Sequence, residues 1–216
     1  MKSNLCIRRR GSVIEKDVRT TYREDSFYSG RSNKMKQEEV SLQKIKKEDI
    51  HSLWEISYGP AADLEWTKWN GPYFNDPILT WEEYKNGFGK DSVDNEMRRS
   101  ILLGEKQVGM VTAYWEDGSL RRWLEVGIVI YDSSLWKKGI GRRALKQWLT
   151  ILFDQEKELE HIGFTTWSGN QRMMKLGERV GMKEEGRIRK VRFWENKFYD
   201  SMKYGVIRKE WKENLS

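Results

Sequence analysis

The chain has 216 residues, of which 38% are hydrophobic and 11 are tryptophan, so it can build one domain with a substantial core. No apolar run is long enough to span a membrane, and no N-terminal segment has the pattern of a secretory signal. The one cysteine, Cys6, excludes an internal disulfide and a multi-cysteine metal site. We therefore expect a cytoplasmic protein without a metal ion. The net charge is +7, but residues 1–36 alone carry ten basic and four acidic residues, so the rest of the chain is close to neutral.

Residues 1–36 have no sustained apolar periodicity and are rich in Ser, Arg and Tyr. This composition predicts a flexible basic arm, followed by a folded domain over residues 37–213. The run Arg8–Arg10 is typical of a solvated tail, and nucleic-acid binding through this arm is the alternative. Because the excess of basic residues lies in the arm, we do not expect the domain itself to bind nucleic acid.

Period-2 alternation predicts the strands of the domain, and 3.6-residue spacing predicts its helices. The expected elements are, in order, a strand over residues 41–45, a helix over 47–56, an aromatic loop over 64–77, a helix over 81–88 capped by Thr80 with Glu83, strands over 99–103, 107–115 and 123–131, a helix over 141–159, a strand over 161–167, a helix over 170–179, and strands over 184–194 and 198–208. This order predicts an α+β domain, in which helices flank a mixed, mostly antiparallel twisted sheet. The strands over 123–131 and 161–167 are joined by a helix, so we expect them to run parallel with a right-handed crossover.

The segment over residues 124–149 has the pattern of a buried strand, a short loop with Gly139 and Gly141, and a long helix. Glycines let a phosphate approach the backbone, and the first-turn N–H groups of the helix point toward it. The spacing is neither a Walker A loop nor a three-glycine dinucleotide motif, and a simple tight turn is the alternative. Four cations flank the glycines, where a helix usually begins with acidic residues: Lys137, Lys138, Arg142 and Arg143. The sequence therefore predicts an anion-binding loop.

The stretch over residues 136–141 resembles the acetyl-CoA motif Q/R-x-x-G-x-G/A of the GNAT N-acetyltransferases, with Trp136 at the position of Gln or Arg. Asn170, followed eleven residues later by Gly181, resembles the N-x(10)-G-F signature of the same family. The aromatic loop and the closing hairpin over 187–208 resemble the subgroup that acetylates ribosomal proteins. The resemblance covers residues 40–211 and implies the GNAT fold.

The resemblance implies that acetyl-CoA is a co-substrate, bound between the fourth and fifth strands, and that an amine is the acceptor. It implies that the glycine loop binds the pyrophosphate, the fourth strand binds the pantetheine arm, and an arginine binds the 3′-phosphate. The implied cofactor-binding residues are Ile128, Val129, Ile130, Lys137, Lys138, Gly139, Ile140, Gly141, Arg142, Arg143, Asn170 and Arg172.

The amine must lose a proton before or during its attack on the thioester, so the reaction needs a base. Glu125-x-Gly127 resembles a family pattern in which the acid faces the acceptor, and we predict Glu125 as the base. The alternative is a carboxylate that only pairs with a nearby cation, such as Arg121 or Arg122.

Many relatives carry a tyrosine seven residues after the motif asparagine, where it protonates the departing thiolate. That position is Gly177 in this chain, and Met173 stands where Ser or Ala is usual. We expect Tyr131 or a water molecule to act in place of the tyrosine, or the thiolate to leave unprotonated.

The aromatic loop is expected to line the acceptor site through Trp66, Trp69, Tyr73 and Phe74, with core packing as the alternative. The predicted function is transfer of an acetyl group from acetyl-CoA to a primary amine, either a protein N-terminus or a small polyamine-like molecule. A non-catalytic acyl-CoA-binding module is the alternative function, because Gly177 replaces the tyrosine. A homodimer is compatible with the sequence.

Overall fold

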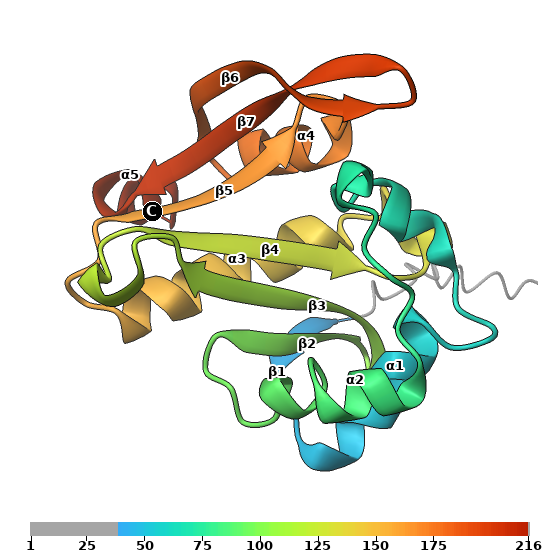
Figure 1. Ribbon diagram of the computed structural model, residues 1–216. Helices are drawn as coiled ribbons and strands as arrows, with labels where there is room; N and C mark the ends of the chain where they lie inside the picture. Colours follow the sequence, from blue (N-terminus) through green and yellow to red (C-terminus); the bar gives the residue numbers. More distant parts are fainter. Residues whose placement is uncertain (1–38, 216) are drawn as a thin grey trace, which may run out of the picture. The chain divides into compact units, whose positions relative to one another are not determined.

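The structure is a computed structural model that describes residues 39–215, so the arm predicted over residues 1–36 lies outside the described residues. The described part contains one seven-stranded sheet in the order β1-β2-β3-β4-β5-β7-β6 (Figure 1). Its strands are β1 (Val40–Gln43), β2 (Arg98–Leu103), β3 (Lys106–Trp115), β4 (Leu124–Ile130), β5 (His161–Trp167), β6 (Lys183–Trp194) and β7 (Lys197–Ile207). Of the described strands, only β4 and β5 pair in parallel, which confirms the direction predicted for these two strands.

The described helices are α1 (Ile50–Ser57), α2 (Trp81–Asn86), α3 (Ile140–Gln155), α4 (Gln171–Arg179) and α5 (Arg208–Leu215). The capping box predicted for α2 is confirmed, because the Glu83 N–H donates to Thr80 Oγ1 and the Thr80 N–H donates back to the Glu83 carboxylate. The helix predicted over 141–159 ends earlier, at Gln155. At this end the Arg208 side chain donates to the carbonyl of Phe153, in the last turn of α3, and to that of Leu159, beyond the helix.

Helix α5 was not predicted, since its short sequence follows β7 without any turn residue. Trp211 on this helix is buried and stacks on Phe153 of α3, with ring centroids 6.4 Å apart. Burial of such a ring contributes on the order of 2–3 kcal/mol, which is enough to hold a helix of two turns that would not persist alone in water.

The sheet has a helix layer on each face. On one face α3 presents Leu145, Trp148, Leu149 and Leu152, all fully buried at the i, i+3, i+4, i+7 spacing of an amphipathic helix. On the other face α1 and α2 pack with Trp66 in a second apolar cluster. Successive side chains of a strand point to opposite faces of the sheet. On β4, Val126 and Ile128 therefore pack in the cluster under α3, and Val129 packs in the second cluster.

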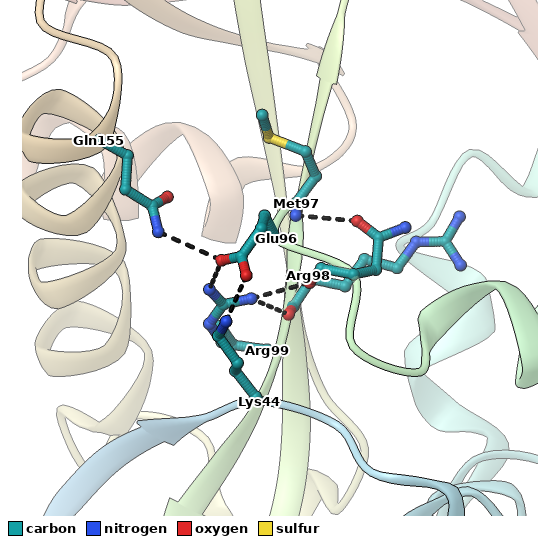
Figure 2. Close-up of polar contacts among 7 residues, drawn as sticks. Lys44, Glu96, Met97, Arg98, Arg99 and Gln155 are labelled. Atoms are coloured by element: carbon teal, nitrogen blue, oxygen red, sulfur yellow. Dashed lines mark hydrogen bonds and ion pairs between the residues drawn. The ribbon is translucent and has the colours of Figure 1, made fainter.

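A polar cluster ties the start of β2 to β1 and to the end of α3 (Figure 2). The buried Arg99 guanidinium donates to Glu96 at 2.6 Å and to the Asn95 carbonyl at 2.8 Å. Lys44 and Gln155 also contact the Glu96 carboxylate. A buried arginine requires such partners. The cluster therefore links β2 with the segment after β1 and with the end of α3.

Among the described residues, no helix has the length and apolarity that a membrane crossing requires. The same part of the chain holds no group of three or more His, Cys, Asp or Glu side chains with the arrangement of a metal site.

Candidate active site

Strands β4 and β5 separate soon after they meet. They pair only at Leu124 with Ile162 and at Glu125 with Gly163, and beyond that point β4 pairs with β3 alone. Figure 1 shows the two strands diverging toward their carboxyl ends, near the aromatic loop. The opening therefore lies at the carboxyl ends of two parallel strands, where ligands of open α/β sheets collect.

The backbone of β4 offers only alternate residues to this opening. The Tyr131 N–H donates to the Val108 carbonyl on β3 at 3.0 Å, so the groups of Val129 also point toward β3, and those of Ile128 and Ile130 point toward β5. Of the three residues predicted to bind the pantetheine arm, Ile128 and Ile130 thus face the opening, and Val129 does not. The Ile130 carbonyl accepts a hydrogen bond of 2.8 Å from the Trp136 indole.

The glycine loop follows β4 and begins α3. Gly139 is the N-cap residue of α3 and has a left-handed backbone with φ +79°, while space is open around it, so its requirement for glycine is conformational. Gly141 lies in the first turn, where an added Cβ would be 3.6 Å from Leu176 of α4 and 3.9 Å from Ile128. This places the helix start between β4 and α4, at the mouth of the opening. Ile140 is buried, Lys137, Lys138 and Arg142 are exposed, and Arg143 is half-buried.

Residues predicted for the cofactor and for the acceptor contact each other at this mouth. The Arg172 guanidinium lies between two indoles, 4.2 Å from the Trp69 ring centroid and 4.4 Å from that of Trp136. The Trp69 carbonyl accepts from Asn170 Nδ2 at 3.0 Å and from Trp167 Nε1 at 3.2 Å. Trp136, at the position of the family Gln or Arg, is therefore one side of a Trp-Arg-Trp stack.

Asn170 has two structural contacts in this arrangement. Its Oδ1 accepts from the Met173 N–H at 3.1 Å and so caps α4, while its Nδ2 binds the aromatic loop. The predicted hydrogen bond from Asn170 to pantetheine would use the second Nδ2 hydrogen.

Glu125 lies where β4 and β5 separate, and it is only 1% exposed. Its Oε1 accepts from Thr165 at 2.9 Å and from Lys203 at 3.0 Å, and its Oε2 accepts from the Tyr114 hydroxyl at 2.9 Å. The carboxylate thus has a cationic partner, as the alternative to the base role anticipated, but the partner is Lys203.

That alternative gave Arg121 and Arg122 as examples of such a cation, and the structure places the contacts of both elsewhere. Arg121 pairs with Glu156 at 2.7 Å, and the Arg122 guanidinium donates to the Glu158 carbonyl at 3.4 Å. Lys203 carries no local signal in the sequence, because its approach to Glu125 depends on the pairing of β7 with β5.

Tyr131 lies in the second apolar cluster, with its ring centroid 5.4 Å from that of Trp66. It is 6% exposed, and burial raises its pKa well above the usual value, which keeps the phenol protonated. Six residues of extended strand separate Tyr131 from Glu125, roughly 20 Å at about 3.3 Å per residue. The two side chains therefore cannot contact the same thioester.

The space beside Gly177 is filled by the ring of Phe164. A Cβ at this position would lie 2.6 Å from Cε1 of Phe164, which stacks on Tyr204 with centroids 5.1 Å apart. The packing of the core thus leaves no room for the tyrosine that many relatives carry here.

The four aromatic residues predicted for the acceptor site have different surroundings. Trp66 is a core residue, yet it also lines a hollow of about 270 Å³ together with Tyr58, Trp194 and Asp76. Tyr73 and Phe74 stack on each other at 4.7 Å and lie against the Arg192 guanidinium. Trp69 belongs to the Trp-Arg-Trp stack. Trp66 therefore both packs in the core and lines the hollow.

These features define a class of protein. A glycine loop at a helix N-terminus, next to two parallel strands that separate, is an arrangement suited to an extended, phosphate-bearing ligand. The family description "Acetyltransferase (GNAT) domain" matches residues 39–183, more than half of the chain, and the protein belongs to the GNAT acetyltransferase family.

Comparison with individual proteins agrees with this family. The chain is similar to "Putative ribosomal N-acetyltransferase YdaF" of Bacillus subtilis (strain 168), with 26% identity over 117 residues, which span 54% of this chain and 62% of that relative. The fold is similar to that of a GNAT acetyltransferase from Bacillus anthracis, with a TM-score of 0.65, 20% identity, and coverage of 81% of this chain and 98% of that one.

Solved structures with ligands share the fold as well. One is spermidine N-acetyltransferase from Vibrio cholerae in complex with CoA and spermine, with a TM-score of 0.64, 18% identity, and coverage of 80% of this chain and 98% of that one. Another is aminoglycoside acetyltransferase AAC(6')-Ib in complex with coenzyme A, with a TM-score of 0.63, 15% identity, and coverage of 82% and 100%. The predicted α+β GNAT fold is confirmed.

Proposed function

We propose that the protein transfers an acetyl group from acetyl-CoA to a primary amine. The observation that carries this proposal is the opening between β4 and β5, with the glycine loop at its wide end and the buried Glu125 carboxylate where the strands separate. These positions suit a ligand with phosphates at one end and a reactive thioester near the other.

In this proposal the first-turn N–H groups after Gly139 bind the pyrophosphate, and the backbone of Ile128 and Ile130 binds the pantetheine arm. Lys137, Lys138, Arg142 and Arg143 add positive charge around the phosphates. Arg172 is an exposed residue held between two indoles, and its guanidinium supplies a further donor set at the same mouth.

Glu125 accepts the proton of the amine, directly or through water, as the nitrogen attacks the acetyl carbonyl. The new C–N bond forms, the C–S bond breaks, and CoA departs with the electron pair as a thiolate. Phe164 fills the space beside Gly177, so water, and not a tyrosine of α4, protonates that thiolate. Tyr131 is too far from Glu125 for this role and stabilises the second cluster instead.

The acceptor class is a primary amine, and the related proteins suggest two kinds. The similarity to the ribosomal N-acetyltransferase favours a protein N-terminus, while the fold shared with spermidine and aminoglycoside acetyltransferases favours a small polycationic amine. Trp66 and the hollow that it lines are the proposed acceptor surface. Cytoplasmic location and homodimer formation stay predictions.

Acetyl-CoA turnover with a panel of amines and N-terminal peptides tests the function. We expect thiol release to depend on one of these acceptors. Glu125→Gln should lower kcat by roughly 10²-fold or more with CoA affinity preserved. Gly141→Glu should abolish CoA binding, because it adds a carboxylate where the phosphates lie.

The competing function is a non-catalytic acyl-CoA-binding module, favoured by the absence of a tyrosine at Gly177. Thiol release that no acceptor accelerates, with CoA binding intact, would establish the module and exclude the enzyme. An unchanged CoA dissociation constant in Gly141→Glu would place the cofactor elsewhere. Nucleic-acid binding through Arg8–Arg10 lies outside the described residues, and deletion of residues 1–34 tests it.

A further inference from the structure

A row of polar side chains crosses four strands at the point where β4 and β5 separate. Tyr114 on β3 lies opposite Glu125 on β4, and Thr165 on β5 lies opposite Lys203 on β7. The row lies on the sheet face away from α3, because Val126 and Phe164, the next residues on β4 and β5, pack in the α3 cluster.

The hydrogen bonds leave Glu125 with one unoccupied acceptor position. A carboxylate has about four lone-pair sites, two on each oxygen. Oε1 accepts from Thr165 and Lys203, which fills it, whereas Oε2 accepts only from Tyr114 among the described residues. One lone pair of Oε2 thus remains for a proton from the acceptor.

Among these three partners, Lys203 alone brings a charge. Burial of a carboxylate at 1% exposure has a desolvation cost, and the Lys203 cation at 3.0 Å offsets part of it. The Lys203 ammonium is itself held by a second carboxylate, Glu116, at 3.8 Å and by the Trp123 ring, with its centroid at 4.9 Å. Its position is therefore fixed from two sides.

We propose that Lys203 is a positioning residue that compensates the charge of the buried Glu125 carboxylate and turns Oε2 toward the acceptor amine. This inference rests on the proposed function, in which Glu125 is the base. Other charged or titratable groups on this face include Tyr114, Glu116 and the His161–Glu185 pair, joined at 2.8 Å on β5 and β6. None of these adds a cation within contact distance of Glu125 among the described residues.

Lysine replacements with an activity profile against pH test the inference. In Lys203→Met the acid limb of the kcat profile should move to higher pH, with kcat at neutral pH reduced at least ~10-fold and the KM for acetyl-CoA unchanged. Lys203→Arg should restore most of the activity and the position of the limb. Lys183→Met is the matched control, because Lys183 also pairs with a glutamate, Glu210, at an exposed site on β6.

Two results would overturn the inference: a Lys203→Met profile that superimposes on the wild-type profile after scaling, or a Lys203→Arg variant as impaired as Lys203→Met. Thermal melting of all variants separates these effects from unfolding. A carbon-13 titration of the Glu125 carboxyl, assigned with Glu125→Gln, measures ionisation without turnover. If that titration differs between wild type and Lys203→Met while no amine is acetylated, the proposed function fails and the ion-pair role of Lys203 stands.

Discussion

At Gly177 the identity of the residue is dictated by a neighbour on the sheet. Phe164 is buried and stacks on Tyr204, so its ring has no free space to move away from an added Cβ. The sequence alone shows that the tyrosine is absent, but it does not show that the position is closed. A tyrosine at position 177 therefore does not fit beside Phe164, so it cannot supply a general acid in this chain.

Gly177→Ala should lower the free energy of unfolding by about 1–3 kcal/mol, because the Cβ would lie 2.6 Å from the Phe164 ring. The higher helix propensity of alanine, worth up to ~1 kcal/mol, offsets part of this loss. Gly141→Ala is the control, since its Cβ would meet Leu176 at an ordinary 3.6 Å. Urea unfolding measures both variants, and equal midpoints for the two would contradict the packing argument.

Among the elements, the aromatic loop between α1 and α2 shows how the chain connects its two proposed binding regions. Trp69 is held at its carbonyl by Asn170 and Trp167 and at its ring by Arg172, while Trp136 covers the other face of the guanidinium. The aromatic loop and the glycine loop therefore share one clamp.

Arg172→Ala should loosen this clamp by about 0.5–2 kcal/mol, the usual range of a cation–π contact. Hydrogen exchange should then quicken across residues 64–78 with little change in β3, whose amides are bonded within the sheet. Arg142→Ala is the control, because Arg142 is an exposed cation on α3 beside the glycine loop. Equal exchange rates in the two variants would show that the stack does not hold the loop.

At the scale of the whole domain, the second apolar cluster buries tyrosines on the face opposite α3. Burial raises the pKa of Tyr84 and of Tyr131 above the usual value, and burial together with Asp76 raises that of Tyr58. A raised pKa in the folded state means that stability is complete below about pH 10 and falls as the pH rises above it. Ionisation of these buried tyrosines should therefore destabilise the domain in alkaline solution.

The midpoint temperature of unfolding should fall above about pH 10, with a loss of up to ~1.4 kcal/mol per pH unit for each buried tyrosine. Tyr84→Phe should make this fall shallower. At neutral pH the same change should be neutral or stabilising, since the Tyr84 hydroxyl is buried without a hydrogen-bond partner among the described residues. A slope that is identical in Tyr84→Phe and wild type would assign the alkaline loss to other groups.

The strands, most helices and the glycine loop were predictable because each depends on local pattern: alternation, helical spacing, capping residues and positive-φ glycines. The prediction was poorer where an element depends on distant partners. Helix α5 is stabilised by Trp211, which packs on Phe153 in the core, and the Phe153 carbonyl near the end of α3 accepts from Arg208. The two residues of each contact are more than 50 positions apart, so no local sequence pattern predicts either contact.

The sequence by itself determined the family resemblance, the order of the elements and the candidate base, since motif spacing and side-chain alternation are properties of the chain. Only the tertiary structure decided what surrounds them. It brought Lys203 to Glu125 across β5, placed Arg172 between Trp69 and Trp136, and closed Gly177 with Phe164. These contacts join residues far apart in the chain, and they depend on the order of the strands in the sheet, which no local stretch of sequence specifies.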